Sequence, residues 1–405
     1  MPNINSAPLL ITAAELIRGP VADRIDGGAV LVRDGRIAAA GSAAEVTAGL
    51  PAHVATLAFP GATILPGLIN GHVHLSFEPG PDPVRAVLEA DDAELLLVMA
   101  QAARTLLDGG VTTARDLGDR GGLALHVRDA VAAGRLAGPR ILAAGAPLTP
   151  TGGHCYFLGG EVDGPDAIRA RIRASAAAGV DLIKVMASGG QITKGGAAMW
   201  ESQFDVDDLR VIVDEAARHG LGVAAHAHGS DSIAAAVEAG VATVEHCTWM
   251  AGPGASDQRA DVAERMAQRG IVACPASSGD WRAMGRIVGE ERALQLFSRL
   301  RWMADLGVRV VPGTDAGLTP FDGLPATLGR YRDFGFTATE ILDMATTGAA
   351  DALGVGTFTG RLRAGFAADL IVVDGDPVAD LDALSRIELV MAQGRLHRPA
   401  PIPTV

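Results

Sequence analysis

Lysine, cysteine and long apolar runs are all scarce in this sequence. Of the 34 basic residues only Lys184 and Lys194 are lysines, and the three cysteines form no CxxC motif. The sequence therefore carries neither a disulfide framework nor a structural zinc knuckle. No stretch approaches the roughly 18 consecutive apolar residues of a membrane span, and the first residues lack the basic start of a secretory signal. We expect a cytoplasmic protein.

Positive charge is also in deficit. The 405 residues include 34 Lys and Arg against 47 Asp and Glu, which gives a net charge of −13 at pH 7. A surface of this sign is not built to neutralise phosphates or anionic lipids, so neither nucleic acid nor a membrane is an expected partner. With 48% hydrophobic and 20% charged residues, the composition is that of a globular protein.

The middle of the chain alternates short apolar runs with Ala-rich, helix-competent stretches. This rhythm is typical of βαβ units, which build a parallel sheet. Eight such runs occur, at residues 62–75, 111–117, 140–145, 181–187, 222–228, 243–248, 271–276 and 309–317. Eight strand–helix units over residues 62–359 predict an α/β fold of the (β/α)8 TIM-barrel type. An open doubly wound sheet is the alternative.

The two ends of the chain, residues 1–61 and 360–405, show a different pattern of short strand-like runs broken by glycine. Within residues 29–41 an Asp-Gly pair separates two such runs and predicts a β-hairpin. Because the ends of a chain often lie close together, we expect both segments to form one small β-sandwich domain beside the barrel.

Metal-binding residue types recur where the predicted strands end, which is the face of a barrel that carries chemistry. His72 and His74 lie two positions apart and so share one side of a strand. The later runs contribute Lys184, His226, His228, His246 and Asp315. Each alone could be a buried, hydrogen-bonded side chain, but together they predict a metal centre. Lysine can join it as a carbamate, an anionic group able to bridge two cations.

This set of motifs resembles the amidohydrolase superfamily, in the group of Xaa-Pro dipeptidase-like, ochratoxin-amidase-like and imidazolonepropionase-like enzymes. The similarity extends over nearly the whole chain. It is carried by PGLINGHVHL, VDLIKVMASGG, AAHAHG, VEHCT, PGTDAG and, at the C-terminal return to the β domain, GFAADLIVVDGDP.

The resemblance implies ligands for two divalent cations. The more buried cation would be bound by His72, His74 and Asp315, the more exposed one by His226 and His246, and carboxylated Lys184 would bridge them. His226 is preferred to His228 because the group usually places these two ligands twenty residues apart, as 226 and 246 are. Zinc is the default expectation, although Mn, Fe or Co suits the same ligands.

The expected reaction is hydrolysis of a C–N amide bond in a dipeptide, an N-acyl amino acid or a related amide. A hydroxide bridging the metals would attack the carbonyl, with Asp315 as general base and then general acid. His228 and His154 are expected to contact the substrate and to donate to the developing oxyanion. Six aromatic residues in the predicted mouth loops suggest an apolar or aromatic substrate moiety. They are Tyr156, Phe157, Trp200, Phe204, Trp249 and Trp281.

Other functions stay open at this point. A lactonase or a cyclic-amide or imidazolone ring hydrolase would use the same groups on a different carbonyl. A mononuclear deaminase is disfavoured because the fifth run reads HAHGSDS without an early glutamate and because Lys184 is present. From another class, a non-catalytic barrel could serve as a scaffold subunit, but the intact ligand set argues against it. The expected partners are a small-molecule substrate and further copies of the chain in a homo-oligomer.

Overall fold

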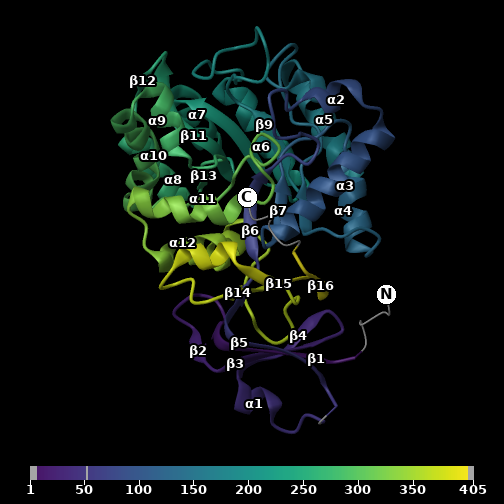
Figure 1. Cartoon of the computed structure of the whole chain (residues 1–405). Coiled ribbons are helices and arrows are strands. Elements are labelled where there is room, and N and C mark those ends of the chain that lie inside the picture. Colours follow the sequence, from purple (N-terminus) through teal and green to yellow (C-terminus); the bar gives the residue numbers. More distant parts are fainter. Residues whose placement is uncertain (1–6, 52, 400–405) are drawn as a thin grey trace.

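The computed structural model describes residues 7–51 and 53–399 and has a mixed α/β fold (Figure 1). An eight-stranded sheet at one end of the molecule combines both ends of the chain. Its strands are β1 (Leu9–Ile17), β2 (Arg24–Asp26), β3 (Gly28–Arg33), β4 (Arg36–Ser42), β5 (Ala55–Pro66), β14 (Leu370–Asp374), β15 (Ile387–Ala392) and β16 (Arg395–His397). β5 pairs in parallel with β1 and antiparallel with β14, which joins the two ends in one sheet.

The predicted hairpin is confirmed. β3 and β4 pair antiparallel, and the two residues between them, Asp34 and Gly35, have φ values of 51° and 72°. Two consecutive positive φ angles are the requirement of a type I′ turn, whose twist matches that of the strands it connects.

The middle of the chain contributes strands that pair in parallel, apart from Ala255–Ser256, which pairs antiparallel with Thr243–Gly252. One sheet contains β6 (Leu68–Val73), β7 (Val111–Asp116) and β8 (Arg140–Ala143), and the other contains β9 (Ile183–Met186), β10 (Val223–Gly229), β11 (Thr243–Gly252), β12 (Ala255–Ser256) and β13 (Val272–Cys274). Isolated parallel bridges continue the pairing beyond these sheets, at Leu148–Val185, Ala273–Val310 and Val73–Ala316. The last predicted run, 309–317, thus makes single bridges rather than a strand. Parallel pairing places the carboxyl ends of neighbouring strands at the same edge.

Residues 62–75, predicted as one strand, are divided at Gly67. β5 ends at Pro66 in the terminal sheet, and β6 begins at Leu68 in the parallel one. A Cβ atom on Gly67 would lie 2.1 Å from Thr112 Oγ1. The chain can pass this close to β7 only because glycine has no side chain.

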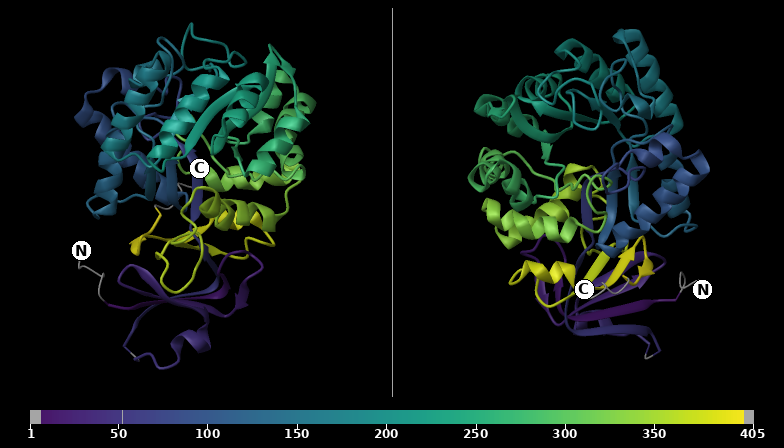
Figure 2. Two further views of the ribbon diagram at one scale, coloured as in Figure 1. Left: turned by 180° about the vertical axis from the view of Figure 1, so that it is seen from behind. Right: turned by 45° about the horizontal axis from the view of Figure 1, so that its top comes forward.

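Helices surround the parallel strands, as both views in Figure 2 show, except for the short helix Ala43–Thr47, which packs against β3 and β4 of the terminal sheet. They are α1 (Ala43–Thr47), α2 (Arg85–Glu89), α3 (Asp92–Asp108), α4 (Leu123–Ala132), α5 (Gly164–Ala178), α6 (Val206–Arg218), α7 (Ser230–Ala239), α8 (Ala260–Arg269), α9 (Trp281–Val288), α10 (Glu290–Asp305), α11 (Leu324–Arg330), α12 (Ala338–Ala345) and α13 (Thr347–Ala352), with 3-10 turns η2 (Tyr156–Leu158), η3 (Tyr331–Phe334) and η4 (Leu381–Ser385). Their ends carry local signals: Asp91 and Asp205 cap α3 and α6, and Gly240 ends α7 in the left-handed region.

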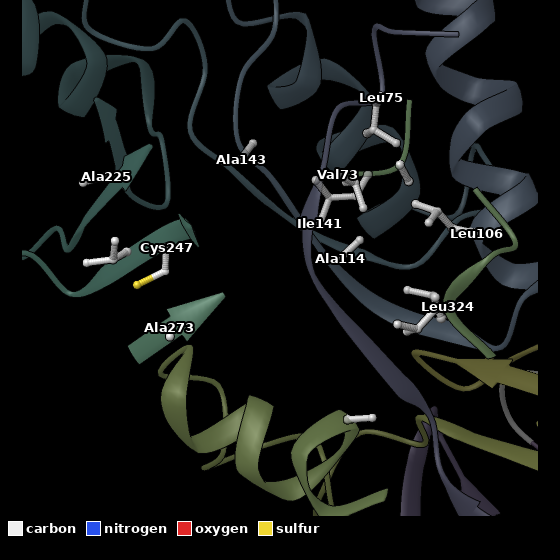
Figure 3. Packing of buried hydrophobic residues seen from close by; sticks show 14 of the residues in the cluster. Val73, Leu75, Leu106, Ala114, Ile141, Ala143, Ala225, Cys247, Ala273 and Leu324 are labelled. Atoms are coloured by element: carbon white, nitrogen blue, oxygen red, sulfur yellow. The ribbon is translucent and has the colours of Figure 1, made fainter. Parts of the chain in front are cut away.

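The main hydrophobic core lies between the parallel strands and these helices. Figure 3 shows Val73, Ala114 and Ile141, from three neighbouring strands, packed close to Leu106 of α3. Close packing of this kind holds the strand ends in fixed positions, which a metal site requires. Within the described residues, no helix combines the length and the apolarity needed to cross a membrane.

Candidate metal centre

The predicted site residues come together at the carboxyl ends of the parallel strands. Seven of the eight line one cavity of about 330 Å³, namely His74, His154, Lys184, His226, His228, His246 and Asp315. His72, the eighth, is fully buried and its Nε2 lies 3.3 Å from that of His74. His246 and Asp315 have positive φ angles of 64° and 57°. Such conformations cost energy in non-glycine residues and concentrate at functional sites.

His72, His74 and Asp315 form a compact group of potential ligands. Asp315 Oδ1 lies 3.4 Å from His72 Nε2 and 3.5 Å from His74 Nε2. The Nδ1 of His74 lies 3.0 Å from the carbonyl oxygen of Gly118, which can only accept a hydrogen bond. His72 Nδ1 lies 2.8 Å from a carboxylate oxygen of Glu245. Both rings therefore carry their proton on Nδ1 and turn an Nε2 lone pair toward Asp315.

This group fits a divalent cation. Burial lowers the pKa of His72 and of His74, so both rings are neutral at pH 7. Burial also raises the pKa of Asp315, and its Oδ1 has no hydrogen-bond partner among the described residues. Two lone pairs and an unpartnered carboxylate oxygen within 3.5 Å of each other have no mutual attraction. A cation between them would supply it.

A second group consists of His226, His228 and His246, whose ligand atoms lie within 4.8 Å of one another. Burial lowers the pKa of His226 and His246 well below the usual range and that of His228 to about 3. His226 Nε2 lies 3.0 Å from the carbonyl oxygen of Gly189, so this nitrogen donates and Nδ1 is left as the potential ligand.

His228 is held through its other nitrogen. Its Nδ1 lies 3.0 Å from Thr248 Oγ1, whose hydroxyl donates to the carbonyl oxygen of His228. The hydroxyl must therefore accept from Nδ1–H, which leaves a lone pair on Nε2. A neutral His228 thus presents an acceptor to the cavity.

Lys184 is 1% exposed and lines the same cavity as members of both groups. Desolvation lowers the pKa of its amine. Burial is the main cause that lowers the pKa of every histidine in the two groups. The positive charge of Lys184 is a further cause for each of them. The amine shares one cavity with members of both groups, and its neutral form is the one that reacts with CO2.

Glu245 and Arg115 lie behind the predicted ligands, and the sequence alone assigned neither of them a role. Glu245 accepts from His72 through one oxygen, and its other oxygen lies 2.8 Å from Arg115 Nη2. Arg115 also donates to the carbonyl oxygen of Gly71 and to Thr243 Oγ1. Burial would raise the pKa of Glu245, but Arg115 and His72 hold it below its usual value. An ionised carboxylate in this position fixes the ring orientation of His72 and increases its basicity.

Glu245→Gln is expected to weaken metal binding by about 10- to 100-fold, because the amide cannot supply the charge that orients His72. The affinity is measured by competition with a chelator for one equivalent of zinc. Glu238→Gln is the matched control, since Glu238 is a partly exposed carboxylate on α7 that pairs with Arg210 and Arg265 and does not line the cavity. Equal affinity in both variants would show that Glu245 has no positioning role.

His154 lies against the second group, with its ring centroid 4.7 Å from that of His226. Thr193 Oγ1 accepts a hydrogen bond from Cys155 N and lies 3.1 Å from His154 Nδ1. Among the described residues, His154 Nδ1 is the only acceptor found for the hydroxyl hydrogen of Thr193. The Nε2 of His154 therefore carries the proton and can donate. Burial lowers the pKa of this histidine to about 4. A Cβ on Gly190 would lie 2.3 Å from the ring, so this contact requires glycine.

The six aromatic residues predicted to line the mouth of the site do not line the cavity, so this prediction is wrong. Trp249, for example, is fully buried and donates from Nε1 to Met303 Sδ at 3.4 Å. Phe157 lines a different hollow. The apolar wall is formed instead by Ile192, Met199, Met284, Phe297 and Leu318.

Comparison with protein families matches residues 63–397 to the Amidohydrolase family. Ochratoxinase of Aspergillus niger is 28% identical over an alignment 411 positions long, which covers 92% of this chain and 82% of the relative. Imidazolonepropionase of Symbiobacterium thermophilum is 27% identical, with coverage of 86% and 84%. A solved structure of a Xaa-Pro dipeptidase with methionine bound in its active site has a TM-score of 0.84 at 27% identity and covers 97% of this chain and 100% of that one. The A. niger ochratoxinase structure has a TM-score of 0.80 at 25% identity, with coverage of 98% and 97%.

Proposed function

This chain belongs to the amidohydrolase family, and on that premise we propose that it hydrolyses a C–N amide bond of a small molecule with the help of two divalent cations. The observation that carries the proposal is the convergence of histidine lone pairs and the unpartnered Asp315 oxygen in one cavity. Relatives named for ochratoxinase and Xaa-Pro dipeptidase activity support an amide as the substrate. A dipeptide or an N-acyl amino acid is the proposed class.

The proposal includes the architecture predicted from the sequence. Residues 62–359 would close as a (β/α)8 barrel, and residues 1–61 with 360–405 would form the β-sandwich domain. The bridges at Val310 and Ala316 support closure, because they connect the last predicted run to β13 and to β6. A homo-oligomer stays a prediction.

The proposed ligands of the first cation are His72, His74 and Asp315, and those of the second are His226 and His246. Lys184 Nζ would add to CO2 with loss of a proton, and the resulting carbamate would be shared by both cations. Zinc suits this set of imidazole and oxygen ligands, as do Mn, Fe and Co. When bound, the cations would polarise the scissile carbonyl and lower the pKa of the attacking water.

Side chains of the cavity would transfer the protons and donate the hydrogen bonds of the reaction. Asp315 would take the proton of the attacking water and pass it to the leaving nitrogen, as general base and then general acid. His154, with its proton on Nε2, would donate to the carbonyl oxygen as charge develops there. His228 would contact the substrate as well, but its Nε2 lone pair suits an N–H or O–H group of the substrate better than an oxyanion.

A substrate screen tests the proposal. Metal-replete enzyme is assayed against a library of dipeptides and N-acyl amino acids, with lactones and cyclic imides in parallel. We expect turnover of amides and its loss on chelation. Turnover of lactones or cyclic imides alone would instead support the alternative carbonyl substrates, and a lack of turnover on every member would favour the scaffold.

A further inference from the structure

An arginine outside the ligand set enters the same cavity. Arg299 of α10 is one of the residues that line it. Its Nε is buried and has no hydrogen-bond partner among the described residues. Burial lowers the pKa of Arg299 to about 10, so the guanidinium keeps its charge at neutral pH.

The packing of α10 explains why this side chain points to the site. Met303 lies one turn after Arg299 and therefore on the same face of the helix. Its sulfur contacts Trp249 Nε1 at 3.4 Å and Cys247 Sγ at 3.6 Å, two residues that closely follow His246 in β11. The face of α10 that carries Arg299 is thus packed against the end of the strand that supplies a proposed ligand.

The Nε of Arg299 is buried, although the residue as a whole is partly exposed. A partly desolvated charge without a partner is costly, and proteins normally pair it. Arg115, the other arginine close to the metal ligands, illustrates this: it is bound by Glu245, by Thr243 and by a backbone carbonyl. Within the described part of the chain, the Nε of Arg299 has no such partner. An anionic ligand in the cavity would be one.

We propose that Arg299 binds a carboxylate of the substrate, so that the enzyme selects amides with a free carboxylate and an apolar side chain. This inference rests on the proposed amide hydrolysis and specifies its substrate class. A guanidinium matches a carboxylate with two parallel hydrogen bonds, and the wall formed by Met284, Phe297 and Leu318 would hold the apolar part. The geometry favours N-acyl amino acids and dipeptides with an apolar C-terminal residue.

Binding of two probes without an amide bond tests the inference. The probes are 3-phenylpropionate and its uncharged analogue 3-phenylpropan-1-ol, titrated calorimetrically into the metal-replete enzyme. Arg299→Met should weaken binding of the carboxylate by about 10- to 100-fold and leave that of the alcohol unchanged. Arg299→Lys should lose less, because it keeps the charge without the paired geometry. Lys194→Met is the matched control, which removes an exposed charge from a loop next to the cavity and should change neither affinity.

Thermal unfolding checks each variant, and Arg299→Met should melt at or above the wild-type temperature because no partner is lost. Equal weakening of both probes, or unchanged carboxylate binding in both Arg299 variants, would overturn the inference. The proposed function can fail separately: Arg299-dependent carboxylate binding without turnover of any amide would reject amide hydrolysis alone. With amide substrates, Arg299→Met should raise KM about 10-fold or more and change kcat little.

Discussion

Lys184→Ala is expected to lower kcat/KM by at least about 10³-fold, because the proposed cation pair, which would contribute several kcal/mol to transition-state stabilisation, would lose its shared ligand. The amine is buried in the cavity and acts electrostatically on both histidine groups. The measurement is steady-state hydrolysis of the amide identified by the screen. Bicarbonate together with propionate should restore part of the activity, since a small carboxylate can occupy the space that the side chain leaves.

Lys184→Met is the control for folding. It fills nearly the same volume and removes an amine that is costly to desolvate, so its melting temperature in the absence of metal should equal or exceed that of the wild type. It should be as inactive as Lys184→Ala but insensitive to propionate. A Lys184→Ala enzyme with wild-type activity would rule out the bridging role.

Asp315→Asn is expected to lower kcat by about 10²- to 10⁴-fold, the usual contribution of a general base and acid. The amide cannot take a proton from water, although it retains an oxygen that can face His72 and His74. Steady-state kinetics should show the loss mainly in kcat, with KM changed much less. Asp305→Asn is the matched control, because Asp305 is an exposed partner of Arg301 on α10. If Asp315→Asn keeps kcat within 10-fold at equal metal content, another group must move the proton.

The sequence was sufficient for the family and for the residues that meet in the cavity. His74, Lys184 and Asp315 come from three distant segments and meet in one cavity. Because parallel pairing places the ends of these segments at the same edge, the short motifs that mark each strand end were enough to predict the meeting. The family resemblance drawn from these motifs is confirmed by the match over residues 63–397. The sequence pattern also identified the hairpin at Asp34-Gly35, where backbone conformation depends on adjacent residues alone.

The features that were missed depend on contacts between residues far apart in the chain. Arg115 and Glu245 are separated by 130 positions, and no sequence motif predicts that these two side chains form an ion pair. Arg299 is one of many arginines, and only the packing of α10 shows that this one combines an unpartnered Nε with a place in the cavity wall. The aromatic prediction failed for the same reason: loop position alone could not show that Trp249 packs against Met303 in the core.

Metal content of the metal-replete enzyme, measured by elemental analysis, tests the central claim most directly. The account predicts about two equivalents per chain in the wild type and a clear deficit in Lys184→Ala. Fewer than about one equivalent in the wild type would contradict it.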